Sequence, residues 1–325
     1  MHILKAVSGE RSLSLREKRR QKKRKKRKMK KDKIYIISSF THDIIISRDS
    51  EKESLGGPAY YSGYTLEMLN ADYKIITSID GFTKDLLKRS YEKLFNKIAY
   101  ESSCDKSFIF IHRYENDLRR SYLLKRGCDI NIKDLFFEKS SKIIISPVFN
   151  EISKELVRKI VENNFFVALD LQGFVRRLGS ENLVINVFND ETNDLLRDVR
   201  IIHASSEEIK DLSKDPVEAS KILMRLSEGD MSIISMGKKG SIVNIKDLGV
   251  FHVSSYRKGV DGDETGCGDI FLASIVYYLS EEKDPLEAVS LASVVAGLRV
   301  MRGFPFNIDP VQINFEKRFI EIRRL

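Results

Sequence analysis

The sequence predicts an α/β protein in three layers, with helices on both faces of a mainly parallel central sheet and a small β lid beside it. Short apolar runs alternate with stretches of helical pattern along most of the chain, which is typical of βαβ units. Residues 106–127 break this alternation and resemble two strands joined by a polar turn. The 325 residues suffice for one large α/β domain or two ordinary ones with a sizeable core.

The predicted strands are short apolar runs bounded by polar residues, the pattern of strands buried on both faces of a sheet. The first is KIYIISSF, residues 33–40, and the next is YKIITSI, residues 73–79. Four further runs are KIIISPV (142–148), FFVALDL (165–171), RIIHAS (200–205) and SIISMG (232–237). Their alternation with helices points to a parallel sheet.

Helical patterns fill the intervals between these strands. The stretch PAYYSGYTLEMLNA opens with Pro58, a residue favoured in the first turn of a helix. Two further helices are expected over residues 150–163 and 216–228. Near the C-terminus, IFLASIVYYL (270–279) and residues 285–304 are expected to pack as neighbouring core helices.

Two segments outside this pattern are expected to form the lid, at about residues 44–56 and 100–128. A β insertion on an α/β body often covers a ligand cleft and closes over it. A plain surface hairpin explains residues 106–127 equally well. The lid belongs to one predicted domain, residues 33–325.

Residues 1–32 form a basic leader with no apolar periodicity, so we expect it to be disordered. The net charge of the whole chain is +9; residues 1–33 hold 16 Lys or Arg and 3 Asp or Glu, a net of +13, which leaves −4 for the rest. One interpretation is an arm that binds nucleic acid or an anionic surface. The other is a solvated tail, or an upstream start codon that is not used, with Met29 as the natural start.

The composition excludes several classes of protein. No apolar run reaches about 18 residues, so no membrane span is expected, and the charged N-terminus lacks the apolar stretch of a secretory signal. Cys104, Cys128 and Cys267 are odd in number and lack C-x-x-C spacing, which argues against a zinc site or a disulfide framework. Free thiols fit a reducing compartment, so we expect a cytoplasmic protein.

The stretch DETGCGDIF, residues 263–271, combines a glycine loop with the start of an apolar helix. The first amides of a helix lack intrahelical acceptors and lie at the positive end of its dipole, which suits a phosphate. Asp269 falls in the first turn, where it could accept a proton from a hydroxyl. Alternatively, Asp269 only caps a core helix. No Gly-Lys-Ser/Thr follows, so the loop is not a Walker motif.

This stretch resembles the D-T-T-G-A-G-D signature of the ribokinase/PfkB family of carbohydrate kinases. It differs from the signature at Glu264 and Cys267 and keeps five of its residues, namely Asp263, Thr265, Gly266, Gly268 and Asp269. The resemblance implies the ribokinase-like three-layer α/β/α fold with a small β lid.

Other motifs agree with the family in order along the chain, over residues 33–310. GGPAYYSG (56–63) resembles the diglycine of the sugar pocket, and SSFTHDIII resembles the first strand and the Asp that follows it. SIISMGKKGS (232–241) resembles the turn beside the nucleotide. HASSEE (203–208) stands where the family has N-x-x-E, with Ser205 in place of Asn.

The resemblance assigns roles to these residues. Asp269 would be the general base, and the amides of Gly266, Cys267 and Gly268 would hold the migrating phosphoryl group. ATP would be the phosphoryl donor, with Mg²⁺ bridging its phosphates. The residues implied for the nucleotide are Gly237, Lys238, Gly240 and Thr265, and those for the metal are Glu208 and Asp263. The residues implied for the substrate are Asp43, Gly56, Gly57, Tyr61, Asp170 and Gln172.

A finer resemblance concerns the substrate. LDLQGFVR (169–176) and ASSEE (204–208) are similar to segments of the inositol-kinase branch of the family. Tyr61 stands where ribokinase-like members usually have Asn after the diglycine. This favours a cyclic polyol or a nucleoside-like substrate over ribose. Arg176 and Arg177 could meet a phosphate, or be solvated, and the five His residues show no metal-ligand spacing.

The leading hypothesis is therefore an ATP-dependent kinase acting on a sugar or polyol hydroxyl, with a nucleoside kinase of the same fold as the alternative. Two other classes stay open. One is a nucleic-acid-binding protein acting through the leader. The other is an inactive nucleotide-binding regulator, for which Glu264 and Ser205 leave room. Lids of this family sometimes pair across a dimer, so a homodimer is possible.

Overall fold

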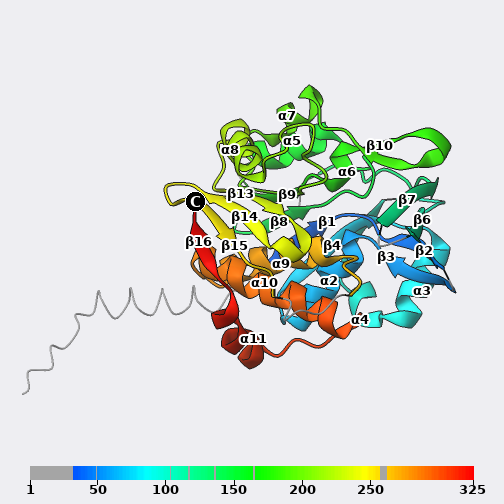
Figure 1. The fold of residues 1–325 in the computed structure, drawn as a ribbon. Helices are drawn as coiled ribbons and strands as arrows, with labels where there is room; N and C mark the ends of the chain where they lie inside the picture. The colour runs from blue at the N-terminus through cyan, green and yellow to red at the C-terminus, as the bar shows by residue number, and fades with distance from the viewer. Residues whose placement is uncertain are drawn as a thin grey trace, which may run out of the picture. The chain divides into compact units, whose positions relative to one another are not determined.

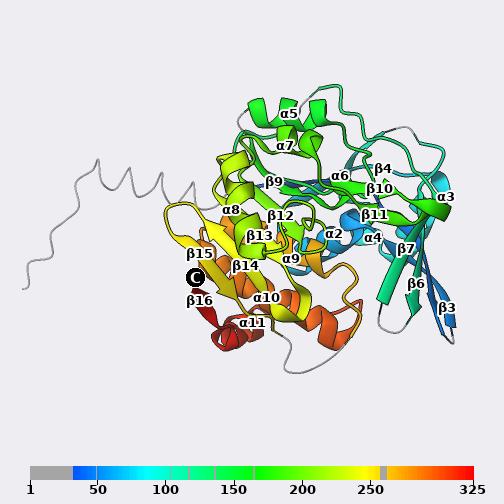
Figure 2. The same cartoon turned by 45° about the horizontal axis from the view of Figure 1, so that its top comes forward.

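The computed structural model describes residues 32–325, except 49, 103, 116–117, 135–136, 164 and 257–261. The predictions made for the basic leader fall on residues 1–31 and therefore lie outside the described residues. Residues 32–325 form one compact unit. Figure 1 and Figure 2 show its elements from two directions.

A ten-stranded central sheet runs through this unit (Figure 1). From edge to edge its strands are β16 (Ile322–Arg324), β15 (Gly249–Val253), β14 (Ser241–Ile245), β13 (Met231–Ser235), β12 (Ile201–Ser205), β9 (Phe166–Asp170), β8 (Lys142–Ile145), β1 (Ile34–Ile37), β4 (Tyr73–Ser78) and β5 (Ile98–Ser102). Every pair from β5 to β13 is parallel, and the pairs from β13 to β16 are antiparallel. The predicted, mainly parallel sheet is confirmed.

Helices cover both faces of the sheet, which confirms the three layers (Figure 2). Alternate residues of β1 show the two faces, because Ile34 and Ile36 belong to one core cluster and Tyr35 and Ile37 to the other. The first cluster includes residues of α2 (Pro58–Met68), α3 (Gly81–Ser90), α4 (Glu92–Phe95), α9 (Cys267–Ser280), α10 (Pro285–Arg302) and α11 (Pro310–Glu316). The second includes residues of α5 (Lys154–Glu162), α6 (Gln172–Val175), α7 (Asp190–Leu196) and α8 (Pro216–Ser227).

Local sequence signals explain where the main helices begin. Proline is the first residue of α2, α8 and α10, a position where its missing N–H costs no hydrogen bond. Asp215 and Asp284 precede α8 and α10, and each accepts a hydrogen bond from an amide of the first turn. Within the described residues, no helix is long and apolar enough to cross a membrane.

A small sheet of four strands lies beside the central sheet, at the right of Figure 1. Its order is β3 (Ser50–Gly56), β2 (Thr41–Ser47), β6 (Phe108–Glu115) and β7 (Leu118–Lys125). Two antiparallel hairpins, β2–β3 and β6–β7, join through the parallel pair β2–β6. The small sheet predicted from residues 44–56 and 100–128 is present. However, β5 belongs to the central sheet, so the segment at 100–128 contributes to the small sheet only from Phe108 onward.

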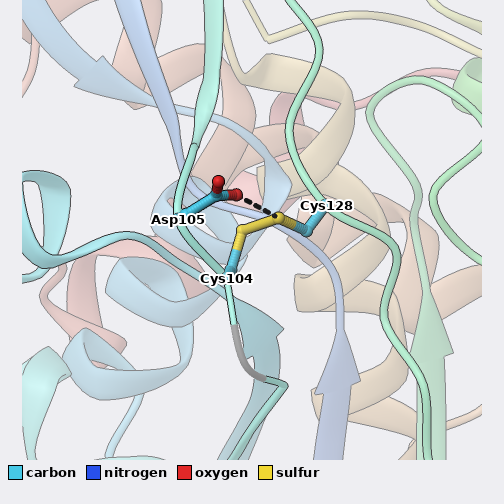
Figure 3. Close-up of side chains that lie close together, drawn as sticks. All are labelled: Cys104, Asp105 and Cys128. Atoms are coloured by element: carbon cyan, nitrogen blue, oxygen red, sulfur yellow. Dashed lines mark hydrogen bonds between the residues drawn. A yellow bond between two sulfur atoms is a disulfide. The ribbon is translucent and has the colours of Figure 1, made fainter.

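A disulfide joins the two ends of the β6–β7 hairpin (Figure 3). Cys104 precedes β6 and Cys128 follows β7, and the carboxylate Oδ1 of Asp105 lies 3.7 Å from Cys128 Sγ. The prediction that the cysteines form no disulfide is therefore wrong for this pair. The two residues are 24 positions apart, and only the hairpin, which returns the chain to its starting point, brings them together. The cytoplasmic location stays a prediction.

Candidate active site

A cavity of about 490 Å³ lies at the carboxyl ends of the central parallel strands. Asp170, Ser205 and Ser235, the last residues of β9, β12 and β13, line one side. Residues at the start of α9 and along α10 line the other. Ligands of open α/β sheets bind at this edge, because strand ends and helix starts bring polar groups together there. The cavity is therefore the candidate active site.

The loop that leads into α9 requires glycine at Gly266. Its φ of 78° lies in the left-handed region, and a Cβ at this position would come within 2.4 Å of the Tyr61 ring. The Cys267 N–H donates to the Glu264 carbonyl at 3.0 Å, so this amide is engaged in closing the turn. The Gly268 amide occupies the second helical position, where a helix supplies no acceptor. The start of α9 thus presents the positive end of a helix dipole to the cavity.

Asp269 lies in the first turn of α9 and lines the cavity, although only 9% of its surface is exposed. Burial raises the pKa of its carboxyl group to about 8, and the negative charge of Asp170 adds to this effect. His203 and Arg176 act in the opposite direction. A carboxylate with such a pKa is a much stronger base than an ordinary aspartate once it is ionised.

Asp170 and His203 form a buried pair on the neighbouring strands β9 and β12. The distance between His203 Nδ1 and Asp170 Oδ2 is 2.8 Å, and each residue is 3% exposed. Burial opposes a charge on the imidazole, but Asp170 outweighs it and raises the pKa of His203. The sequence analysis missed His203. The sequence did contain a signal for it. In RIIHAS the two-residue period of a strand places His203 on the same face as Ser205, which stands in a motif already assigned to the site.

Glu208 is the predicted metal residue that lines the cavity. Its Oε2 accepts a hydrogen bond from Ser205 N at 2.7 Å. Burial, and after it the charge of Asp170, raise the pKa of Glu208. A carboxylate oxygen that lines the cavity is a ligand of the kind that Mg²⁺ prefers, and a bound cation would favour its ionised form. The residues present therefore fit the metal that the family implies.

Asp263, the other predicted metal residue, is bonded within the protein. Its Oδ2 lies 2.6 Å from Arg299 Nη2, and its Oδ1 accepts from Thr265 N at 2.9 Å. Partial burial opposes ionisation, but the hydrogen bonds from Thr265 and Arg299 outweigh it and hold the pKa of Asp263 below its usual range. In the described structure, Asp263 bonds to Thr265 within the loop before α9 and to Arg299 of α10, and its role toward a metal stays a prediction.

The side sheet places a second polar group next to the glycine loop. Asp43 on β2 is 4% exposed, and its Oδ2 lies 3.6 Å from His112 Nε2 on β6. Gly56 packs against Asp43 so closely that a Cβ would come within 2.0 Å of Oδ2. Gly57 has a φ of 84° just before α2. Gly56 of the predicted diglycine is thus the residue against which the Asp43 carboxylate packs, whereas Gly57 lies against Ser39 and Thr41.

Two side chains of the small sheet bond directly to the catalytic loop. Tyr114 Oη lies 3.1 Å from Thr265 Oγ1, and Arg119 Nη1 donates to the same oxygen at 3.3 Å. Arg119 Nη2 also contacts the His112 ring at 3.0 Å, which connects this contact to Asp43. The small sheet is therefore held against the loop that carries Asp269. Neither Tyr114, His112 nor Arg119 was singled out from the sequence.

The predicted site residues divide into two groups. Nine line the cavity: Asp170, Gln172, Glu208, Gly237, Gly240, Gly266, Cys267, Gly268 and Asp269. Seven do not: Asp43, Gly56, Gly57, Tyr61, Lys238, Asp263 and Thr265. Of these, Asp43 and Gly56 belong to the small sheet, Tyr61 belongs to α2, and Thr265 belongs to the loop before α9. Arg176, which the sequence left as a solvated residue or a phosphate contact, is half-buried and donates to Val148 O at 3.0 Å.

Comparison with known proteins bears on these roles. The sequence pattern of the family described as pfkB family carbohydrate kinase matches residues 123–303, more than half of the chain. No curated protein matches the chain by sequence. The matched residues include the motifs at 169–176, 203–208, 232–241 and 263–269, whereas those at the first strand and at 56–63 lie outside them.

Solved structures share the fold at low sequence identity. A pyrophosphate-dependent kinase of the ribokinase family, complexed with a pyrophosphate analog and myo-inositol, has a TM-score of 0.73 and 18% identity over 87% of this chain and 99% of that chain. Ribokinase from Thermotoga maritima has a TM-score of 0.68 and 19% identity, over 88% and 99% of the two chains. A nucleoside kinase from Methanocaldococcus jannaschii has 0.68 and 16%, over 89% and 98%. The predicted ribokinase-like fold is confirmed.

Proposed function

The chain belongs to the pfkB family of carbohydrate kinases, and on this premise we propose that it transfers a phosphoryl group from ATP to a hydroxyl of a sugar or cyclic polyol. That it is a kinase follows from the family. The choice of acceptor and donor is our proposal. The observation that carries it is the position of Asp269, a buried carboxylate with a raised pKa in the first turn of a helix whose start opens into the cavity.

In the proposed reaction Asp269 takes the proton of the acceptor hydroxyl. The start of α9 holds the migrating phosphoryl group at the positive end of its dipole, so base and anion site adjoin one another. Gly266 allows this arrangement, because its left-handed backbone turns the chain into the helix beside the Tyr61 ring. Burial of Asp269 excludes water from the carboxylate, which favours transfer to a bound hydroxyl over hydrolysis.

The other half of the cavity fits a nucleotide and its metal. Gly237 and Gly240 have positive φ values and line the cavity at the turn after β13. Glu208 would hold Mg²⁺, which when bound would neutralise the phosphates of the donor. Lys238, also assigned to the nucleotide from the sequence, is exposed beside this turn.

The acceptor would lie between the start of α9 and the small sheet. Thr41 Oγ1 and Asp43 Oδ1 are buried without hydrogen-bond partners among the described residues, and both residues flank Gly56. Buried oxygens without partners are costly in a protein and indicate a place where a polar ligand bonds. A polyol offers several hydroxyls at once, so it matches this pair better than an apolar ligand does. An inositol-like substrate also agrees with the segments at 169–176 and 204–208.

A matrix of donors and acceptors tests the proposal. ATP and pyrophosphate would each be incubated with inositols, pentoses, hexoses and nucleosides in the presence of Mg²⁺, and product formation followed by ³¹P NMR. The expected result is transfer from ATP to a polyol or sugar, with none in the Asp269→Asn control. Transfer to nucleosides alone would favour the nucleoside kinase. A folded protein that binds ATP but transfers to no acceptor would contradict the proposal and indicate a regulator.

A further inference from the structure

His203 is a buried titratable side chain that the proposed mechanism does not use. Its Nδ1 is paired with Asp170, whereas its Nε2 is buried without a hydrogen-bond partner among the described residues. The residue nevertheless lines the cavity. A buried pair that only supported the fold would be expected to satisfy both ring nitrogens, because an unpaired polar atom in the interior lowers stability.

The Cε1 atom of the ring lies close to the start of α9. A Cβ placed on Gly268 would lie 3.3 Å from His203 Cε1. Cε1 is bonded to both ring nitrogens, so Nε2 lies one bond from the ring atom nearest to this position. On another side, the ring packs edge-on against Phe271 of the same helix, with the ring centres 6.1 Å apart. The imidazole is thus fixed between Asp170 and the site where the phosphoryl group is expected.

The hydrogen bonds of Asp170 point to the same arrangement. Oδ2 bonds to His203 at 2.8 Å, and Oδ1 accepts from the Gln172 amide at 2.9 Å. Both carboxylate oxygens therefore have partners inside the protein. This geometry suits a residue that orients the imidazole better than one that contacts the substrate, the role that the family resemblance implied.

The charges around the ring favour its protonated form. Three carboxyl groups face it, from Asp170 on β9, Glu208 after β12 and Asp269 on α9, and Arg176 is the neighbouring cation. With Nδ1–H donating to Asp170, a protonated ring carries a second N–H, at the buried Nε2 of a side chain that lines the cavity. A charged N–H donor in a buried site is the kind of group that binds phosphate oxygens tightly.

We propose that His203 is a catalytic residue that donates a hydrogen bond from Nε2–H to the phosphoryl group at the start of α9, and that Asp170 is its positioning residue. During transfer, the bond from phosphorus to the acceptor oxygen forms as the bond to the leaving phosphate oxygen breaks. The acceptor proton passes to Asp269, and His203 keeps its own proton. The inference rests on the proposed function, because it assumes that a phosphoryl group occupies this cavity.

Two substitutions separate the two ring nitrogens. His203→Asn keeps an amide that can bond to Asp170 but removes the donor at Nε2, whereas His203→Gln places an amide donor near Nε2. Binding of inorganic pyrophosphate and of adenosine, which lacks phosphate, would be measured by calorimetry without added metal. We expect His203→Asn to weaken pyrophosphate binding about 10- to 100-fold, His203→Gln to recover part of the loss, and adenosine binding to stay unchanged.

The outcomes distinguish the inference from the proposed function. Wild-type protein that binds neither pyrophosphate nor adenosine would contradict the proposed function, and the inference with it. Wild-type protein that binds pyrophosphate no more tightly than His203→Asn does would overturn the inference alone. Equal losses of pyrophosphate and adenosine affinity would also overturn it, since they would indicate a merely structural role.

A measurement on the unaltered side chain covers the case in which the variants do not fold. In wild-type protein labelled with ¹⁵N-histidine, the His203 signals would be identified with variants of His2, His42, His112 and His252. Saturation with pyrophosphate should shift the Nε2 resonance of His203 and slow the exchange of its proton with water. Unchanged His203 signals in protein saturated with pyrophosphate would contradict the proposed contact.

Discussion

The loop before α9, residues 263–266, has the cavity on one side and the small sheet on the other. The two sides differ in how many of their polar groups already have partners. On the cavity side, Asp269 and Glu208 have raised pKa values, and His203 Nε2 has no hydrogen-bond partner among the described residues. On the side of the small sheet, Tyr114 and Arg119 already bond to Thr265, although Thr41 Oγ1 and Asp43 Oδ1 have no partner within the described part of the chain. The cavity side is thus arranged for a charged ligand before one arrives. On the sheet side, the hydrogen bonds from Tyr114 and Arg119 to Thr265 are ones that a ligand could replace.

This difference suggests that the two sides have different roles in binding and closure. Rigid strand ends and the start of α9 hold the donor side in place, and such preorganised donors need no rearrangement during the reaction. The small sheet has contacts that a ligand could replace, which suits a part that opens and closes. Gly266 is held between these parts of the site, because the Tyr61 ring of α2 packs directly against it.

The largest effect is expected at Gly266, where the loop before α9 packs against Tyr61. In Gly266→Ala the new methyl group would collide with the Tyr61 ring and the residue would have to keep a φ of 78°. A displacement of about 1 Å at a catalytic loop costs roughly 100-fold in rate, so we expect kcat to fall by at least that factor. Kinetics at saturating substrate would measure it. The account of the loop is contradicted if the variant keeps more than a tenth of wild-type kcat.

Removing the disulfide should weaken the sheet side alone. The double variant Cys104→Ser, Cys128→Ser opens a loop of 24 residues, which in the chain-entropy model lowers the free energy of unfolding by about 3 kcal/mol. Hydrogen exchange should rise first in β6 and β7, while the affinity for ATP stays the same. Reduced wild-type protein is the matched control and should behave alike. If the binding free energy of ATP fell by as much as the free energy of unfolding, the two sides would not be separable.

The pH dependence of the reaction tests the charge on the cavity side. Asp269 must be ionised to accept a proton, and burial raises its pKa to about 8. We therefore expect kcat/KM to fall about tenfold for each pH unit below that value, with a plateau above it. Rates measured from pH 5.5 to 9.5 would reveal the slope. A profile that is flat down to pH 5.5 would exclude Asp269 as a base with a raised pKa in the free enzyme.

The smallest effect is expected from a single contact of the small sheet. Tyr114→Phe removes the hydroxyl that lies 3.1 Å from Thr265 Oγ1, a bond worth about 1 kcal/mol. KM for the acceptor should change by less than about tenfold, with the affinity for ATP unaffected. Tyr122→Phe, on the neighbouring strand β7, is the matched control. An effect on ATP affinity larger than that on the acceptor would contradict the assignment of Tyr114 to the acceptor side.

The sequence was informative about the cavity side because its residues lie in continuous motifs. DETGCGD combines loop, helix start and base within seven residues, and SIISMGKKGS holds a strand with the glycine turn beside it. Alternating apolar runs likewise predicted the central sheet. Local backbone requirements, such as glycine at a left-handed position, leave a trace that can be recognised without a structure.

The contacts of the sheet side leave no such trace. Tyr114 and Thr265 are 151 positions apart, and Asp43 meets His112 only because β2 and β6 pair in parallel. Cys104 and Cys128 likewise meet through the β6–β7 hairpin, so their spacing could not predict the disulfide. His203 falls between these cases. It lies in a predicted strand, but its partner Asp170 comes from the neighbouring strand β9, and the pairing of β9 with β12 was not predictable residue by residue.

Asp269→Asn gives the most direct test of the account, because both sides of the site are assumed to meet at this carboxylate. Ionisation of Asp269 is opposed in the folded protein between its ordinary pKa of 3.8 and about 8, so wild-type stability should fall as the pH rises through this range. Asn lacks this penalty, and the variant should therefore be at least as stable as wild type at pH 8. This control separates loss of chemistry from loss of fold.

The decisive measurement is a single turnover with excess enzyme, in which transfer from ATP to the acceptor found in the matrix is followed for both proteins. We predict that Asp269→Asn binds ATP with unchanged affinity and transfers the phosphoryl group about 10²- to 10⁴-fold more slowly than wild type. A stable variant that transfers within tenfold of the wild-type rate would contradict the central claim that Asp269 is the base.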